Sequence, residues 1–170
     1  MDTIFTLGDN DDNIKLNMDD LYERKKQHDL NTLSTYNKIL NRIGPDLVHE
    51  KVNFESYNEV MNKRPKMKIG EFLIEQKYFS GVGNYIRCEA CYESKISPFR
   101  LVGNLTENER KELFKQLIKI CHSAYESLIK KDMHYKCKVY RQKTTPKGEI
   151  VLSEKLEKTR NVYWVPSVQK

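Results

Sequence analysis

Two glycines and an asparagine lie between two apolar stretches, and their residue types and spacing could do chemistry. Gly81 and Gly83 can adopt φ > 0 and let another backbone come close, and Asn84 is of a type that favours the N-terminal cap of a helix. The N–H groups at a helix N-terminus bind anions, and for a basic chain the anion is most often a nucleic-acid phosphate. The spacing therefore predicts a phosphate clamp. A plain corner between two helices is the alternative, because short glycine motifs also occur by chance.

A helix on each side must position this turn. Ile69, Phe72 and Leu73 lie at helical spacing before it, and a second helix is predicted to start at Asn84 and to stop at Ser97. A further helix is predicted to begin with a capping box of Thr106 and Glu109. Its apolar stripe predicts packing and no cofactor role, and contains Leu113, Leu117, Ile120, Ala124 and Leu128.

The remaining elements are weaker in pattern. Residues 3–7 and 13–16 flank a polar turn and predict a hairpin, residues 19–41 predict one or two helices, and residues 54–61 predict a short helix. Beyond residue 131 three runs alternate with period two, at 137–140, 149–152 and 161–165. They predict a small β module at the end of the chain.

Charge and composition limit the possible partners. The chain has 170 residues and a net charge of +6; residues 1–65 hold 9 Lys/Arg and 12 Asp/Glu (net −3), and residues 66–170 hold 21 and 12 (net +9). The positive field that would attract a polyanion therefore lies in the last two-thirds, although a solvated lysine face would look the same. No apolar run reaches the length of a membrane span and no signal peptide begins the sequence, so we expect an intracellular protein without a membrane partner.

Three stretches resemble, in the correct order, motifs of the formamidopyrimidine-DNA glycosylase and endonuclease VIII family, and most closely its vertebrate and viral Nei-like members. QKYFSGVGNY at residues 76–85, followed by Glu89 and by KISP at 95–98, is similar to the family's helix-two-turns-helix signature. NRIGPDL at 41–47 resembles the segment before that domain. Residues 159–169 are similar to the last hairpin of the family, where an arginine precedes a Cys-Pro-x-Cys-Gln zinc end; here the cysteines are replaced by Val165 and Val168.

The resemblance implies a mainly α fold with a small β part: a helix-two-turns-helix domain (41–132) followed by a zincless-finger β-hairpin (133–170). Residues 1–40 would be a linker and a remnant hairpin of an N-terminal β-sandwich. In the binding site, the resemblance implies that Asn84 holds phosphates beside a damaged nucleotide and that Arg160, at the tip of the last hairpin, reaches another phosphate of the bent strand. Lys68 and Arg87 flank the clamp formed by Gly81, Gly83 and Asn84 and are candidates for further backbone contacts, with a solvated surface role as the alternative.

No metal or other cofactor is expected. In the tail, His134 and Cys137 lack a second pair of zinc ligands, and the resemblance implies a hairpin held by the packing of Ile150, Val162, Trp164 and Val165. Cys88 and Cys91 are a rival ligand pair. They are one helical turn apart with no partner pair in the sequence, which favours two packed thiols.

The catalytic part of the family pattern is missing from this sequence. In this family an N-terminal proline amine attacks the sugar and an adjacent glutamate assists proton transfer, both within a Pro-Glu-Gly-Pro start. This sequence opens Met1-Asp2-Thr3, and its first proline is Pro45. We therefore assign no catalytic residues, leave open whether the chain is an enzyme, and expect no borohydride-trapped complex with abasic-site DNA.

The function predicted is thus the damaged-DNA-binding portion of a base-excision-repair DNA glycosylase/AP lyase that removes oxidised bases. The expected partner is double-stranded DNA with an oxidised base or an abasic site, bound by a monomer in the nucleus or a viral factory. A noncatalytic helix-hairpin-helix or ribosomal-type nucleic-acid-binding protein is the alternative. A structural protein in which the glycines and lysines are incidental would not explain three motifs in order.

Overall fold

The computed structural model describes residues 18–40, 42–49, 51–130, 135–156 and 160–170, which divide into a unit of residues 1–42 and a unit of residues 43–170. In the first unit, α1 (Met18–Leu40) is one continuous helix, where the sequence predicted one or two. The hairpin predicted at 3–16 lies outside the described residues. No helix in the described part of the chain is long and apolar enough to cross a bilayer.

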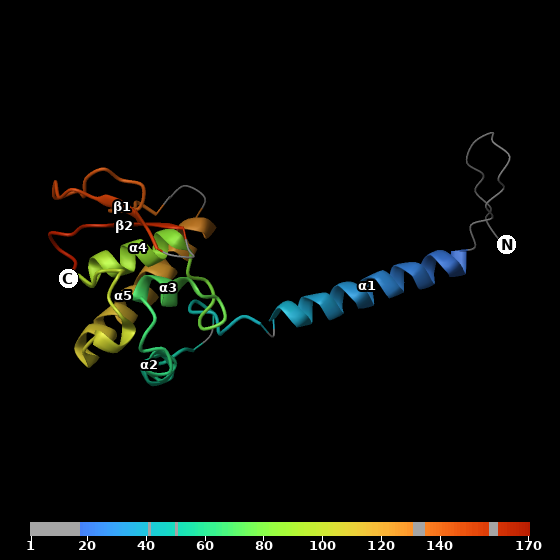
Figure 1. Ribbon diagram of the computed structural model, residues 1–170. Helices are drawn as coiled ribbons and strands as arrows, with labels where there is room; N and C mark the ends of the chain where they lie inside the picture. The colour runs from blue at the N-terminus through green and yellow to red at the C-terminus, as the bar shows by residue number, and fades with distance from the viewer. Residues whose placement is uncertain (1–17, 41, 50, 131–134, 157–159) are drawn as a thin grey trace. The chain divides into compact units, whose positions relative to one another are not determined.

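The second unit is mainly helical with one two-stranded sheet, which confirms the predicted fold class (Figure 1). Its elements in order are α2 (Phe54–Asn62), α3 (Ile69–Ile74), α4 (Asn84–Glu93), the 3₁₀ turn η1 (Val102–Asn104), α5 (Glu107–Ile129), β1 (Leu152–Lys155) and β2 (Asn161–Trp164). The strands are antiparallel, with Leu152 opposite Trp164 and Lys155 opposite Asn161.

Side-chain caps fix the starts of two helices. Asn53 accepts the backbone N–H of Ser56 at the start of α2. Thr106 and Glu109 form the predicted capping box at the start of α5. Arg100 binds both carboxylate oxygens of Glu109, at 2.5 and 3.1 Å, so the cap is also tied to the chain before it.

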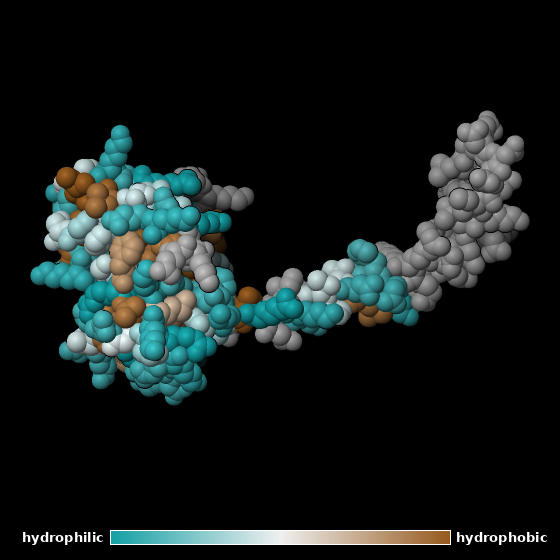
Figure 2. All heavy atoms as spheres, in the orientation of Figure 1, coloured by the Kyte–Doolittle hydropathy of each residue, from teal (hydrophilic) through white to brown (hydrophobic). Residues whose placement is uncertain are grey.

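The main core packs α2, α3, α4 and α5 together. Tyr57, Met61 and Ile69 are fully buried, and Leu113 and Leu117 of the predicted α5 stripe are buried against them. Leu128, predicted in the same stripe, is 77% exposed because it lies near the end of α5. The hydrophilic residues cover much of the visible surface of this unit (Figure 2).

A second hydrophobic cluster joins α4 to the C-terminal hairpin, and β2 lies beside α4 (Figure 1). Its buried members are Cys88, Tyr92, Val139, Val151, Leu156, Val162 and Val165. Trp164 and Val168 pack against them, but Ile150 is 68% exposed, so its predicted packing role is wrong. Val165, which replaces a cysteine of the family pattern according to the resemblance, is buried completely.

The β module is smaller than the alternating pattern predicted. Residues 137–140 do not form a strand, because the buried carboxylate of Glu89 accepts their N–H groups: those of Lys138, Val139 and Tyr140, each at 2.9 Å. A backbone whose donors point at one carboxylate cannot offer them to a neighbouring strand. Glu89 therefore anchors this segment to α4.

Hydrogen bonds close the loop before β1. The buried Thr145 hydroxyl accepts the N–H groups of Lys147 and Glu149, each at 3.2 Å, and donates to Glu149 at 2.5 Å. Tyr92 on α4 donates to the same carboxylate oxygen at 2.9 Å. This polar network and the cluster around Val165 hold the hairpin on α4.

Candidate nucleic-acid interface

The glycine turn between α3 and α4 has a fixed backbone. Gly81 has a φ of +90°, which an L side chain rarely adopts. Gln76 closes the turn: its side-chain amide donates to Val82 O at 2.9 Å, and its side-chain oxygen accepts the N–H of Gly81 at 3.2 Å. The turn is therefore preorganised.

The segment that precedes the domain braces this turn from the other side. Gly44 donates to Gln76 O at 2.7 Å, and Ser80 donates to Pro45 O at 3.0 Å. A Cβ on Gly44 would lie 2.2 Å from Tyr78 O, so this approach requires glycine. Gly44 and Pro45 of the NRIGPDL stretch thus have a structural role beside the clamp.

The helix α4 starts at Asn84 as predicted, but its N-terminal cap is Gly83 and not Asn84. Gly83 has ordinary extended angles (φ −89°, ψ 177°), and a Cβ there would meet no atom within 4 Å. The first N–H groups of a helix have no partner within it, so the mouth of α4 offers donors beside an open space. This geometry suits an anion.

The side chain of Asn84 joins α4 to the hairpin. Its Nδ2 donates to Asn161 O at 3.0 Å, and its Oδ1 accepts from Arg87 Nη2. Arg160 is the residue directly before Asn161; its side chain is exposed, and its carbonyl accepts from Arg87 at 3.2 Å. The structure therefore brings the two principal candidates, which are 76 residues apart in the sequence, to one place.

Arg87 is a predicted candidate for a phosphate contact, but its position in the structure does not fit that role. It is fully buried, and it also donates to Gly70 O at 3.0 Å. Burial lowers its pKa, but a guanidinium stays charged at neutral pH. A buried guanidinium with these partners does not meet solvent or a ligand, so we remove Arg87 from the direct contacts. Lys68 is half-buried at the N-terminal cap of α3, two residues before Gly70.

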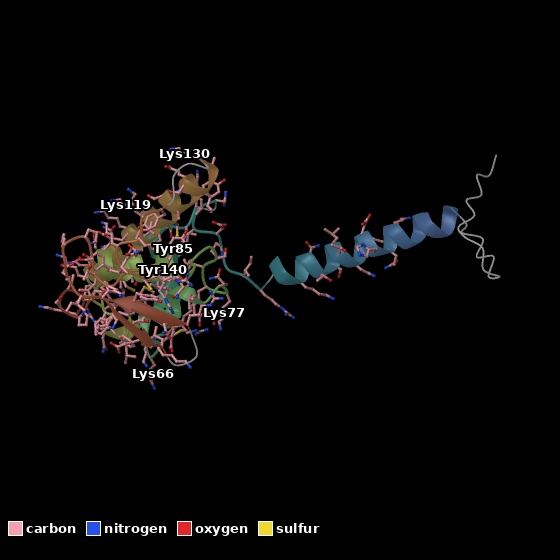
Figure 3. All side chains as sticks on the ribbon, turned by 90° about the horizontal axis from the view of Figure 1, so that it is seen from above. Lys66, Lys77, Tyr85, Lys119, Lys130 and Tyr140 are labelled. Atoms are coloured by element: carbon pink, nitrogen blue, oxygen red, sulfur yellow. The ribbon has the colours of Figure 1, made fainter. Side chains whose placement is uncertain are left out.

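A tyrosine cavity of about 250 Å³ includes Tyr85, the residue that follows Asn84. It is lined by Tyr85, Tyr135 and Tyr140, together with Cys137 and the last turns of α5. Tyr85 and Tyr140 lie on the same side of the second unit (Figure 3), with ring centroids 6.2 Å apart. The ring centroids of Tyr85 and Tyr135 are 5.9 Å apart. The sequence alone did not predict this cavity, because isolated tyrosines far apart in the sequence carry no periodic signal.

The described residues contain no group of three or more His, Cys, Asp or Glu side chains that could hold a metal ion. Cys88 and Cys91 are both buried in the packing of α4, which confirms the prediction of packed thiols. Burial raises the pKa of Cys91 to about 12, so this thiol stays protonated at neutral pH.

Family models match most of the second unit. Residues 43–133 match the formamidopyrimidine-DNA glycosylase H2TH (helix-two-turns-helix) domain, and residues 127–170 match the formamidopyrimidine-DNA glycosylase C-terminal domain. The formamidopyrimidine-DNA glycosylase of Psychromonas ingrahamii is 35% identical over 88 residues, which are 48% of this chain and 32% of that protein.

Solved structures share the fold. A crystal structure of a viral DNA glycosylase has a TM-score of 0.67 and 27% identity, over 82% of this chain and 54% of the other. The Lactococcus lactis enzyme in complex with DNA containing FAPY-dG has a TM-score of 0.67 and 24% identity over the same shares. This chain spans from about a third to about half the length of these proteins. With its H2TH and C-terminal domains, the chain belongs to the formamidopyrimidine-DNA glycosylase family.

Proposed function

We propose that residues 43–170 form the part of a base-excision-repair DNA glycosylase/AP lyase that grips damaged duplex DNA. The observation that supports this most is the hydrogen bond from Asn84 Nδ2 to Asn161 O, since it joins the mouth of α4 to the residue after Arg160. Two groups suited to phosphates then face one strand. The substrate proposed is double-stranded DNA with an oxidised base or an abasic site, bound by a monomer in the nucleus or in a viral factory.

The mouth of α4 binds one phosphate. Gly81 and Gly83 leave space for it, and the N–H groups and dipole of the helix supply the attraction. Arg160 then offers a planar guanidinium to a neighbouring phosphate, in the bidentate geometry that this side chain favours. Lys68 adds positive charge at the start of α3, the helix on the other side of the turn.

The tyrosine cavity holds a base that has left the stack. Tyr85 directly follows Asn84, so the cavity begins one residue from the proposed phosphate site. Aromatic faces stabilise unstacked bases, and family enzymes need the target base out of the duplex. The nucleophile that the family resemblance implies, an N-terminal proline, is not among residues 43–170, and we assign these residues the binding step alone.

Binding of fluorescent duplexes, measured by anisotropy, tests this function. We expect the full chain to prefer a duplex with an abasic-site analogue over an unmodified one. We expect Asn84→Ala and Arg160→Ala each to weaken that binding by roughly 1–3 kcal/mol, because the first removes the amide that ties the mouth of α4 to Asn161 and the second removes an ion pair with a phosphate. For each phosphate that a variant no longer neutralises, the slope of log affinity against log salt should also become shallower by about 0.9.

Lys111→Ala is the matched control for charge. Lys111 lies in the second turn of α5, whereas Ala124, Ser127 and Leu128 of the same helix line the tyrosine cavity, which places Lys111 about 20 Å along the helix from that cavity. Its variant should bind like the parent. If both clamp variants also bind like the parent, the proposed DNA grip is wrong.

A further inference from the structure

Arg87 lies at the point where three segments of the second unit meet. Its guanidinium donates to Gly70 O of α3, to Asn84 Oδ1 of α4, and to the carbonyls of Arg160 and Asn161 at 3.2 and 3.4 Å. The side chain is fully buried. All of these oxygens belong to the helices that flank the glycine turn or to the start of β2.

Burying a charged side chain costs free energy unless hydrogen bonds compensate for the lost solvation. A fully buried arginine with several hydrogen bonds therefore indicates that its geometry matters. The guanidinium is a planar fork whose N–H groups point in fixed directions, and it can hold several oxygens in one plane. The two carbonyls it holds lie on either side of the Cα of Asn161, and the first of them belongs to the peptide bond that directly follows Arg160. The backbone from which the Arg160 side chain leaves is thereby fixed against α4.

We propose that Arg87 is a positioning residue for DNA binding: it touches no DNA, and it sets where the side chain of Arg160 stands relative to the mouth of α4. This inference rests on the proposed function of Arg160 and adds a residue whose effect passes through it. Asn84 takes part on both sides, since it accepts from Arg87 and donates to Asn161 O.

A double-mutant cycle distinguishes positioning from independent roles. Arg87→Lys keeps the charge but replaces the fork by a single ammonium, so the two carbonyls lose their common partner. We expect Arg87→Lys to weaken binding of the abasic-site duplex about as much as Arg160→Ala does, roughly tenfold, and the double variant to bind within about twofold of Arg160→Ala alone. If the fold-losses of affinity of the two single variants multiply in the double variant, the proposal is wrong.

Arg110→Lys is the matched control for stability. Arg110 also uses its guanidinium as a tie, to Asn58 Oδ1, Asn62 Oδ1 and Val102 O, but it links α5 to α2 and η1. Melting temperatures measured alongside affinities should show that both lysine variants are destabilised while Arg110→Lys keeps the parent affinity. An equal loss of affinity in Arg110→Lys would mean a general effect of stability and would also overturn the proposal.

A second variant covers a failure to fold. If Arg87→Lys does not fold, Arg87→Gln replaces it, because a neutral amide leaves no unpaired buried charge. The same cycle then applies. If Arg160→Ala binds DNA as tightly as the parent, the proposed clamp is wrong. A loss of affinity in the Arg87 variant could then not act through Arg160, and the positioning role would be refuted as well.

Discussion

At the scale of single residues, the two glycines of the clamp have different structural roles. Gly81 is needed by the fold, since its φ of +90° strains any L side chain. Gly83 is not, since its angles are extended and a Cβ would meet nothing within 4 Å. A glycine that the fold does not require, at the mouth of a helix, suggests that a ligand needs the space.

This difference makes Gly83→Ala a sensitive test of the phosphate site. We expect its melting temperature to stay close to that of the parent, because the restriction of the unfolded chain by alanine offsets the poorer suitability of alanine at a helix N-terminal cap. We expect its affinity for abasic-site duplex to fall about tenfold, because the methyl group occupies the space of the phosphate. Thermal unfolding and anisotropy on the same samples measure both.

Gly81→Ala is the comparison at the same turn. Its positive φ predicts a lower melting temperature, roughly 1 kcal/mol or more of stability lost, so any loss of binding there would have two causes. Parent-like DNA binding by Gly83→Ala would show that no ligand approaches this backbone.

At the scale of elements, the start of α5 is stabilised by a charged cap. The hydrogen bond from Arg100 lowers the pKa of Glu109 to about 2; burial opposes this, and the N–H and hydroxyl of Thr106 assist it. A carboxylate whose pKa is lower in the folded state stabilises the protein above its unfolded pKa, about 4.3 for glutamate, and loses that effect as the pH falls toward the folded value.

Glu109→Gln should therefore destabilise the chain at pH 7 and matter little at pH 2. We expect about 1 kcal/mol at pH 7, the usual value of a helix cap, shrinking between about pH 4.5 and pH 2. Urea unfolding at a series of pH values measures it. Glu126→Gln, which removes the exposed pair of Glu126 with Lys130 at 3.7 Å, should have little effect at any pH. A difference between Glu109→Gln and the parent that stays constant down to pH 2 would contradict the assignment.

The helices of the second unit could be predicted because their signals are local. The capping box of Thr106 and Glu109 and the stripe through Leu113 and Leu117 depend on spacing alone. The segment at 137–140 could not, because its alternation is that of a strand while its donors are taken by Glu89, about fifty residues earlier. An alternating apolar pattern predicts an extended backbone, but it does not identify the groups to which that backbone will hydrogen-bond.

The same reason limits what the sequence revealed of the site. Gly81, Gly83, Asn84 and Arg160 belong to recognisable motifs, and the structure brings the asparagine and the arginine together. That Arg87 is buried as a tie between segments, and that Tyr85 and Tyr140 share a cavity, depends on contacts between distant parts of the chain. A local pattern does not contain such contacts.

At the scale of the whole molecule, the second unit has what an independent domain needs. Its two hydrophobic clusters contain, among the described residues, nothing before Leu47. The positive charge also lies in this unit. Residues 1–42 hold 6 Lys/Arg and 8 Asp/Glu (net −2), whereas residues 43–170 hold 24 Lys/Arg and 16 Asp/Glu (net +8), and the two sum to the net +6 of the chain. Both the fold and the attraction for DNA should therefore reside in residues 43–170.

A fragment of residues 43–170 should unfold cooperatively at the melting temperature of the full chain, since it keeps every core residue in the described part of the chain. It should bind abasic-site duplex at least as tightly, with a gain of up to about threefold at low salt because two net negative charges are removed, and the gain should vanish near 0.5 M salt, where screening is strong. Calorimetry and anisotropy over a salt series measure both. A fragment that melts well below the full chain, or that loses DNA affinity at every salt concentration, would show that residues 1–42 support the domain or take part in binding.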